Sequence, residues 1–146
     1  MYFAGIIAFL AFLFFSTSIY TRVGTFVDPL SIIISLSFSF TMLLASGLLP
    51  DFLRGLKLMG QKENTYTIIE LKKTVEAVKL MIRLLIASGT LGALIGIVGI
   101  LTKLADISML GPNLAVALLT MFYSVLFILI LLPVQAKASA IIHTLE

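Results

Sequence analysis

The distribution of charged side chains is the feature of this sequence that most limits its fold. Four long stretches contain no Asp, Glu, Lys, Arg or His: residues 1–21, 29–50, 84–102 and 107–136. A helix rises 1.5 Å per residue, so about 20 apolar residues cross a hydrocarbon core of about 30 Å. The sequence therefore predicts an all-α integral membrane protein with four transmembrane helices. The expected spans are Tyr2–Tyr20, Leu30–Leu49, Leu84–Thr102 and Asn113–Gln135.

The composition excludes several classes of protein. Charged residues make up 12% and apolar residues 60% of the chain, whereas an ordinary soluble domain has about 25% charged residues. So few polar side chains cannot cover a soluble globule, which excludes a soluble enzyme and a free nucleic-acid-binding protein. The chain has no cysteine and one histidine, His143, and it shows no serine–histidine, paired-acid or metal-ligand pattern. We therefore expect no enzymatic activity, no metal and no cofactor.

Lysine and arginine are distributed unevenly between the connections. The segment between the second and third spans, residues 51–83, contains seven of the ten, and Lys137 follows the fourth span. Arg22 and Lys103 are alone in the other two connections. Cytoplasmic loops are enriched in these residues. We therefore expect residues 51–83 to form a cytoplasmic loop and both chain termini to be cytoplasmic.

Signals for helix ends agree with these spans. Asp28 stands directly before a proline, which is typical of an N-cap followed by the first helical residue, and Pro50 is expected to close the second span. Thr67 and Glu70 have the spacing of a capping box. The apolar residues that follow them recur every three or four positions and continue into the third span without a break. This pattern predicts one long helix over about residues 67–104 that protrudes into the cytoplasm.

Four glycines lie along one face of the third span. Their spacing of three and four residues removes side chains from that face and lets another helix approach closely. One interpretation is packing against another span of the same chain. The other is that the face lines a subunit contact or a central pore. The residues are Gly89, Gly92, Gly96 and Gly99.

Hydroxyl and amide side chains follow one face of the fourth span. Asn113, Thr120 and Ser124 fall within a narrow arc of the helix. They can bond helices together, since membrane Ser and Thr satisfy their own preceding carbonyls, or they can line an ion or water path. We include Thr90 of the third span among the ion-pathway candidates. A further stripe on the second span is interpreted as close helix packing; it consists of Ser31, Ser35, Ser39 and Ser46.

The spans themselves contain no ionisable side chain. Ion and proton relays in membranes use such groups. A chain without them cannot bind and release a proton alone within the bilayer. Either this protein moves no protons, or a partner supplies the acid.

Several segments together resemble one family. Residues 88–99 resemble the third span of MotA/TolQ/ExbB-type proton-channel subunits, and residues 110–120 resemble the fourth span of MotA. Residues 26–31 are similar to the start of its second span, and residues 51–57 to the turn that follows. The resemblance covers most of the chain.

The resemblance implies a particular assembly in the bacterial inner membrane. In that family, four-span subunits form a pentamer around a dimer of a one-span MotB/ExbD-like partner. Each partner helix brings one aspartate, and proton passage through that acid drives rotation. This arrangement would account for the missing acid and for the glycine-lined third span.

The chain also departs from the family pattern. Gly89 stands where members usually have proline, and Gly96 stands where the TolQ and ExbB branch has threonine. The fourth-span threonine corresponds to Met121 when the span is aligned from its start, and to Thr120 when it is aligned from its end. The large cytoplasmic domain that pushes the flagellar rotor is nearly absent, which leaves the membrane motor unit.

Two functional hypotheses follow. The leading one is a subunit of an ion-driven rotary stator that forms a ring around a one-span partner. The alternative is an oligomeric structural membrane protein that conducts no ions. A solute transporter would need internal repeats or broken central helices, and the sequence shows neither.

Overall fold

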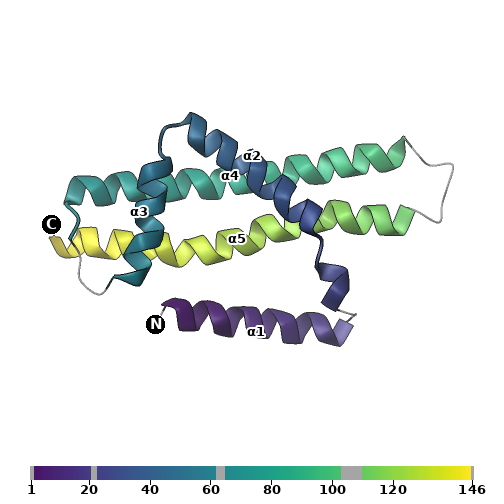
Figure 1. The fold of residues 1–146 in the computed structure, drawn as a ribbon, viewed down its shortest axis with the longest axis horizontal. Helices are drawn as coiled ribbons and strands as arrows, with labels where there is room; N and C mark the ends of the chain where they lie inside the picture. The colour runs from purple at the N-terminus through teal and green to yellow at the C-terminus, as the bar shows by residue number, and fades with distance from the viewer. Residues whose placement is uncertain (1, 21–22, 62–64, 103–109, 146) are drawn as a thin grey trace.

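A computed structural model describes residues 2–20, 23–61, 65–102 and 110–145. Every regular element in these ranges is helical, so the prediction of an all-α protein is confirmed. Figure 1 shows the arrangement. The elements are α1 (Tyr2–Tyr20), the short 3-10 helix η1 (Val23–Phe26), α2 (Pro29–Ala45), α3 (Leu49–Gly60), α4 (Ile68–Leu101) and α5 (Leu110–Leu145).

Four of these helical segments are long and apolar enough to cross a membrane. They are Tyr2–Ile19, Gly24–Ala45, Ile68–Leu101 and Leu110–Leu145. The four predicted spans therefore have helical counterparts. Helices α4 and α5 contain 34 and 36 residues, or about 51 and 54 Å. Both are much longer than a hydrocarbon core of about 30 Å.

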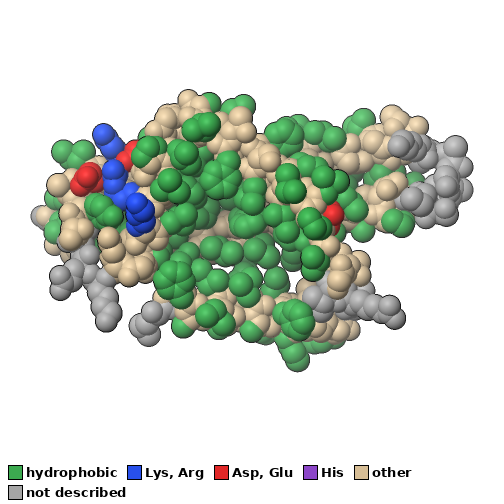
Figure 2. Space-filling model, in the orientation of Figure 1, with side chains coloured by type: hydrophobic (Ala, Val, Ile, Leu, Met, Phe, Trp, Pro, Cys, Tyr) green, Lys and Arg blue, Asp and Glu red, His purple; other side chains and the backbone are tan. Residues whose placement is uncertain are grey.

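Helices α4 and α5 form the centre of the molecule as a long antiparallel pair, and α2 lies obliquely across them (Figure 1). Apolar side chains from α2, α3, α4 and α5 meet in one buried cluster that includes Leu43, Phe52, Leu85 and Val134. A second cluster lies nearer the carboxyl end of α5. Figure 2 shows all the Lys and Arg side chains of this face near that end, together with most of its acidic ones, and apolar side chains over most of the remainder.

The second span ends earlier than the sequence suggested. Helix α2 stops at Ala45, and Gly47 has a backbone φ of 73°. Residues other than glycine rarely adopt this conformation. The chain turns there and a new helix begins at Leu49. Pro50 occupies the first turn of α3, where its missing N–H costs nothing. The expectation that Pro50 closes the second span was therefore wrong.

Helix α3 corrects the description of residues 51–83 as a loop. It lies crosswise over α4 and α5 (Figure 1). Its buried face consists of Phe52, Gly55, Leu58 and Met59. At its end, the ammonium of Lys137 donates to the carbonyls of Leu58 at 2.7 Å and Gln61 at 3.2 Å. Because these carbonyls have no partner within their own helix, Lys137 fixes α3 to α5.

The capping box at the start of α4 is confirmed. The Thr67 N–H donates to the Glu70 carboxylate at 2.9 Å, and the Glu70 N–H donates to the Thr67 hydroxyl at 3.4 Å. The Thr67 hydroxyl also donates to the Glu70 carboxylate at 2.9 Å. The two bonds that the carboxylate accepts from Thr67 lower the pKa of Glu70, with smaller contributions from the positive charges of Arg54 and Lys73. One unbroken helix then runs to Leu101. The expected end near residue 104 lies outside the described residues.

Helix α1 is the least integrated element. None of the residues in Tyr2–Ile19 is buried. The Tyr2 hydroxyl donates to the carbonyl of Ile130 on α5 at 3.0 Å. Large side chains such as Phe12, which is 71% exposed, point away from the rest of the chain.

Candidate functional site

The four glycines on one face of α4 are called the glycine seam below; they are Gly89, Gly92, Gly96 and Gly99. Three of them bring α4 into close contact with α5. A Cβ atom added to Gly96 would lie 2.6 Å from the Cβ of Ala117, far closer than two carbon atoms normally approach. The other two contacts are as tight: a Cβ atom added to Gly92 would lie 2.5 Å from the methyl carbon of Thr120, and one added to Gly89 would overlap the Ser124 hydroxyl. These glycines therefore pack within the chain, which is the first of the two interpretations drawn from the sequence.

Gly99 differs from the other three. A Cβ atom at this position would meet nothing within 4 Å. The close contact between α4 and α5 thus opens near the last turn of α4. Gly99 lines the resulting groove instead of the contact itself.

Buried hydroxyl groups join α2 to the α4–α5 pair. The Ser35 and Ser124 hydroxyls lie 2.5 Å apart, and those of Ser39 and Ser88 lie 2.7 Å apart. Ser31 donates to the carbonyl of residue 116 at 3.2 Å. Among the described residues, no buried side-chain polar atom lacks a hydrogen-bond partner. The interpretation of the serine stripe as helix packing therefore holds for these three serines, whereas Ser46 is exposed.

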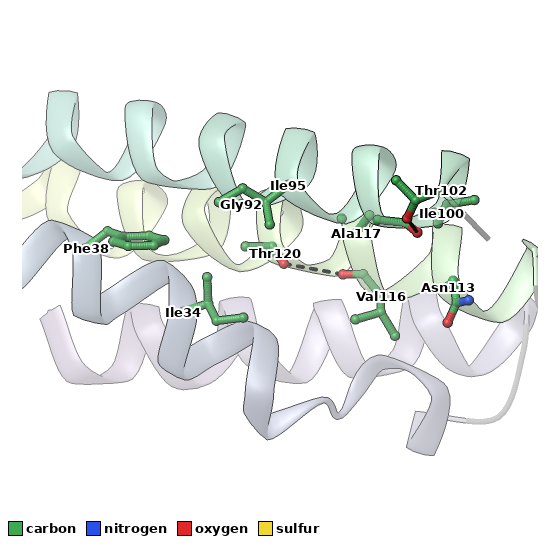
Figure 3. A pocket seen from close by; sticks show the side chains of 12 residues that line it. Ile34, Phe38, Gly92, Ile95, Ile100, Thr102, Asn113, Val116, Ala117 and Thr120 are labelled. Carbon is green, nitrogen blue, oxygen red and sulfur yellow. Dashed lines mark hydrogen bonds between the residues drawn. The ribbon is translucent and has the colours of Figure 1, made fainter.

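A groove of about 450 Å³ opens where α2, α4 and α5 diverge (Figure 3). Ile34 and Phe38 of α2 form one side of it, and the glycine seam forms another. Its walls are mostly apolar. The polar side chains in the lining are Thr102, Asn113 and Thr120.

Thr120 is packed at the base of this groove. It is 3% exposed, and its hydroxyl donates to the Val116 carbonyl one turn earlier at 3.3 Å (Figure 3). Its methyl group faces Gly92. Asn113 lies two turns away, exposed on α5. These two of the four ion-pathway candidates thus share one groove.

The other two candidates lie elsewhere. Ser124 is 2% exposed and is held in the serine network beneath the groove. Thr90 lies on the exposed side of α4, where its hydroxyl donates to the Ile86 carbonyl at 2.8 Å. The four side chains therefore do not converge on one site.

The sequence did not predict a set of hydrogen bonds that joins η1 and the start of α2 to α5. The Tyr123 hydroxyl donates to the carbonyl of Phe26 and accepts the N–H of Asp28 at 3.0 Å. The Asp28 carboxylate in turn accepts the N–H of Ser31 at 3.1 Å, as the N-cap signal predicted. Nothing in the sequence marks Tyr123 as the partner, since aromatic residues are common throughout these spans. This contact fixes the start of α2 against the middle of α5.

The structure defines an all-helical protein that has four helices long and apolar enough to cross a membrane and a core packed by glycines and hydroxyls. The described residues contain no group of three His, Cys, Asp or Glu side chains that could hold a metal. The sequence profile of the MotA/TolQ/ExbB proton channel family matches residues 53–146. The chain belongs to this family. A comparison with curated proteins gives no match.

The matched region contains α3 from residue 53 onward and the whole of α4 and α5. It therefore includes the glycine seam and every candidate site residue. The two alternatives for the family's fourth-span threonine lie in very different surroundings. Thr120 is buried against α4, whereas Met121 is 43% exposed on the outer side of α5.

Proposed function

We propose that this protein is a subunit of an ion-driven rotary stator in the bacterial inner membrane, with protons as the ion. It forms a ring of five copies around the transmembrane helices of a one-span partner. The proposal rests on one combined observation: the chain matches a proton-channel family, yet its predicted spans contain no ionisable side chain. Because intramembrane proton relays need an acid, the partner supplies it as an aspartate.

The same proposal sets the position of the helices in the membrane. The charge-free part of α4 begins at Leu84, so the part from Ile68 to Arg83 extends beyond the hydrocarbon core. It carries four of the ten lysines and arginines, and residues 51–67 before it carry three more, which favours a cytoplasmic location for this end. Both chain termini are then cytoplasmic.

Exposed apolar surface supports assembly into a ring. On α4, Leu94 and Val98 are 54% and 58% exposed, and on α5, Leu118 and Val125 are 54% and 51% exposed. Lipid covers such side chains on the outside of a ring, and neighbouring subunits or the partner cover them elsewhere. Head-to-tail contacts of this kind close into a cyclic assembly when the rotation between copies allows it.

Native mass spectrometry of gently solubilised protein tests the ring. We expect five copies as the main species, together with the partner helices when the two proteins are co-expressed. A monomer or a dimer as the main species would rule out the ring. A stable ring that conducts no protons with its partner would favour the alternative of a structural oligomer.

Two matched substitutions test which face of the helices serves the ion path. Thr120→Val and Thr90→Val each delete one hydroxyl that donates to its own helix, and each keeps the side-chain shape. We place the path along the groove, where a hydroxyl can bond to the protonated partner carboxyl. A charged carboxylate at the bilayer centre otherwise costs at least about 2.5–3.5 kcal/mol.

The measurement is proton flux into liposomes that contain the ring and its partner. We expect reduced flux for Thr120→Val and unchanged flux for Thr90→Val. Reduced flux for Thr90→Val alone would move the path to the outer face of α4. Unchanged flux for both would leave the partner as the source of all coupling chemistry.

A further inference from the structure

A hollow of about 300 Å³ separates α1 from α5. On the side of α1 it is lined by Tyr2, Gly5, Ile6 and Phe9. Tyr2, Ile6 and Phe9 follow one another at intervals of four and three residues, so they share one face of the helix. Each of the three is half-buried. This face of α1 is therefore directed toward α5 without packing closely against it.

The missing side chain of Gly5 contributes to this hollow. A Cβ atom at Gly5 would meet nothing within 4 Å, which is the opposite of the tight contacts of the glycine seam. Gly5 is exposed, and so are Leu129 and Pro133 on the other side of the hollow, so the hollow is open at the surface of the protein. A cavity of about 150 Å³ holds a benzene molecule. The hollow therefore has room for a longer hydrocarbon group.

Pro133 leaves a backbone acceptor beside the hollow. It lies inside α5, and because proline has no N–H, the carbonyl of Leu129 lacks the donor that normally stands four residues later. The Tyr2 hydroxyl donates to the next carbonyl, that of Ile130, at 3.0 Å. A carbonyl without a donor is costly in an apolar environment. This end of the hollow therefore favours a ligand that donates a hydrogen bond.

The pairing of α4 with α5 gives the level of this end of the hollow. Gly89 packs against Ser124, and the two helices run antiparallel (Figure 1). Six residues from this contact, toward the charged end of each helix, lie Arg83 on α4 and Ile130 on α5, so these two are at about the same level. Arg83 is the last charged residue before the charge-free stretch of α4. In the proposed membrane placement, Ile130 and the Tyr2 hydroxyl thus lie at the cytoplasmic boundary of the hydrocarbon core, where tyrosine is common.

From this boundary the hollow extends toward the centre of the bilayer. Helix α1 runs antiparallel to α5 (Figure 1), so its later residues lie deeper. Phe9 follows Tyr2 by seven residues, or about 10 Å along the helix axis. One leaflet contributes about 15 Å to the hydrocarbon core. The hollow therefore matches the part of an acyl chain nearest to its headgroup.

We propose that this hollow binds a phospholipid of the cytoplasmic leaflet whose headgroup carries hydrogen-bond donors. One acyl chain lies between α1 and α5 along Ile6 and Phe9, and the headgroup donates to the Leu129 carbonyl that Pro133 leaves free. The bound lipid supplies the packing between α1 and α5 that the chain itself lacks. This inference rests on the membrane placement in the proposed function, but it does not depend on the ring.

Native mass spectrometry with added lipid tests the proposal. The full-length protein is depleted of lipid in a neutral detergent and titrated with phosphatidylethanolamine or with phosphatidylcholine that has the same acyl chains. The ammonium group of the first lipid donates hydrogen bonds, whereas the trimethylated amine of the second has no N–H. We expect the first phosphatidylethanolamine per chain to bind at a several-fold lower concentration than phosphatidylcholine. Equal binding of the two lipids would overturn the inference.

Three substitutions locate the site. Gly5→Leu fills the hollow and should abolish binding of the first lipid. Gly24→Leu is the matched control, because a Cβ atom there also meets nothing within 4 Å and Gly24 does not line the hollow; it should bind lipid like the parent. Pro133→Ala restores the N–H that bonds to Leu129, and it should bind both lipids alike. Binding by Gly5→Leu that equals the parent would overturn the inference.

The same spectra keep this result separate from the test of the ring, because they count chains and lipids independently. A monomer or a dimer that still prefers phosphatidylethanolamine would rule out the ring and support the lipid site. A complex of five chains without that preference would support the ring and overturn the lipid site.

Discussion

The contact between Gly96 and Ala117 allows a quantitative test of the α4–α5 packing. In Gly96→Ala the new methyl carbon starts 2.6 Å from the Ala117 Cβ and 3.2 Å from its Cα. Carbon atoms pack at about 3.5–4.0 Å, so α5 must move away by about 1 Å. The same change at Gly99 meets nothing within 4 Å. Both substitutions replace glycine with alanine one turn apart on α4. The gain in helix propensity is therefore the same in both and cancels when their stabilities are compared.

The expected difference follows from the cost of overpacking. Extra carbon atoms in a close-packed interior cost about 1–3 kcal/mol. In membranes such packing provides much of the energy of helix association. We therefore expect Gly96→Ala to be less stable than Gly99→Ala by about 1–3 kcal/mol, or about 5- to 150-fold in the unfolding equilibrium constant.

The assay is reversible unfolding of the full chain by sodium dodecyl sulfate in mixed micelles, followed by energy transfer between dyes on exposed positions of α2 and α5. Ala117→Gly in the Gly96→Ala background removes the opposing methyl group. It should recover stability beyond the sum of the single changes, because the two residues are in direct contact. Equal unfolding midpoints for Gly96→Ala and Gly99→Ala would refute the packing argument.

Three further substitutions probe the contacts of α3 and the capping box of α4 by the same assay. Gly55→Leu should destabilise the chain by about 1–3 kcal/mol, because even a Cβ at Gly55 would lie 3.1 Å from the Thr74 side chain. Lys137→Met should cost about 1 kcal/mol, since the Leu58 carbonyl loses a charged donor. The lowered pKa of Glu70 means that its carboxylate stabilises the fold above the unfolded-state pKa of about 4.3, and that this contribution is lost as pH falls through the folded value. The stability difference between Glu70→Ala and the parent should therefore shrink below about pH 4.

The long-range features of the fold were predictable where one physical rule dominates. The absence of charge over long stretches located the four apolar helices, because any charged residue in the hydrocarbon core is costly. The pairing of Thr67 with Glu70 predicted the start of α4, because that signal depends on residues three positions apart.

The turn between α2 and α3 shows where such rules fail. Hydropathy continues unchanged from residue 30 to residue 49, so it cannot reveal that the helix ends at Ala45. The local signal was present: Gly47 precedes Pro50, and glycine after a helix followed by proline at the start of the next is a recognised pattern. The spacing of Phe52, Leu58 and the residues between them also fitted a helix.

The candidate site was predictable only in part, because a stripe on a helix does not specify its partner. The glycines of the third span indicated a close contact, and only the structure identifies α5 as the neighbour. Thr120 and Asn113 line the same groove, as their positions on one face of the same helix predicted. Thr90 lies outside that groove, because the arc it occupies on α4 is turned away from α5.

The buried serine network has a consequence for biosynthesis. Ser35 is made 89 residues before its partner Ser124. At typical translation rates of 5–20 residues per second, α2 therefore waits for about 4–18 s before that partner exists. A serine tolerates this interval, because its hydroxyl bonds to a carbonyl one turn earlier, as Ser39 does to Ser35 at 3.0 Å. An asparagine has a second N–H donor and a carbonyl oxygen, which would still lack partners in a nascent helix surrounded by apolar groups. In the proposed membrane placement, the choice of hydroxyl groups thus lets α2 insert alone and still bond to α4 and α5 when they arrive.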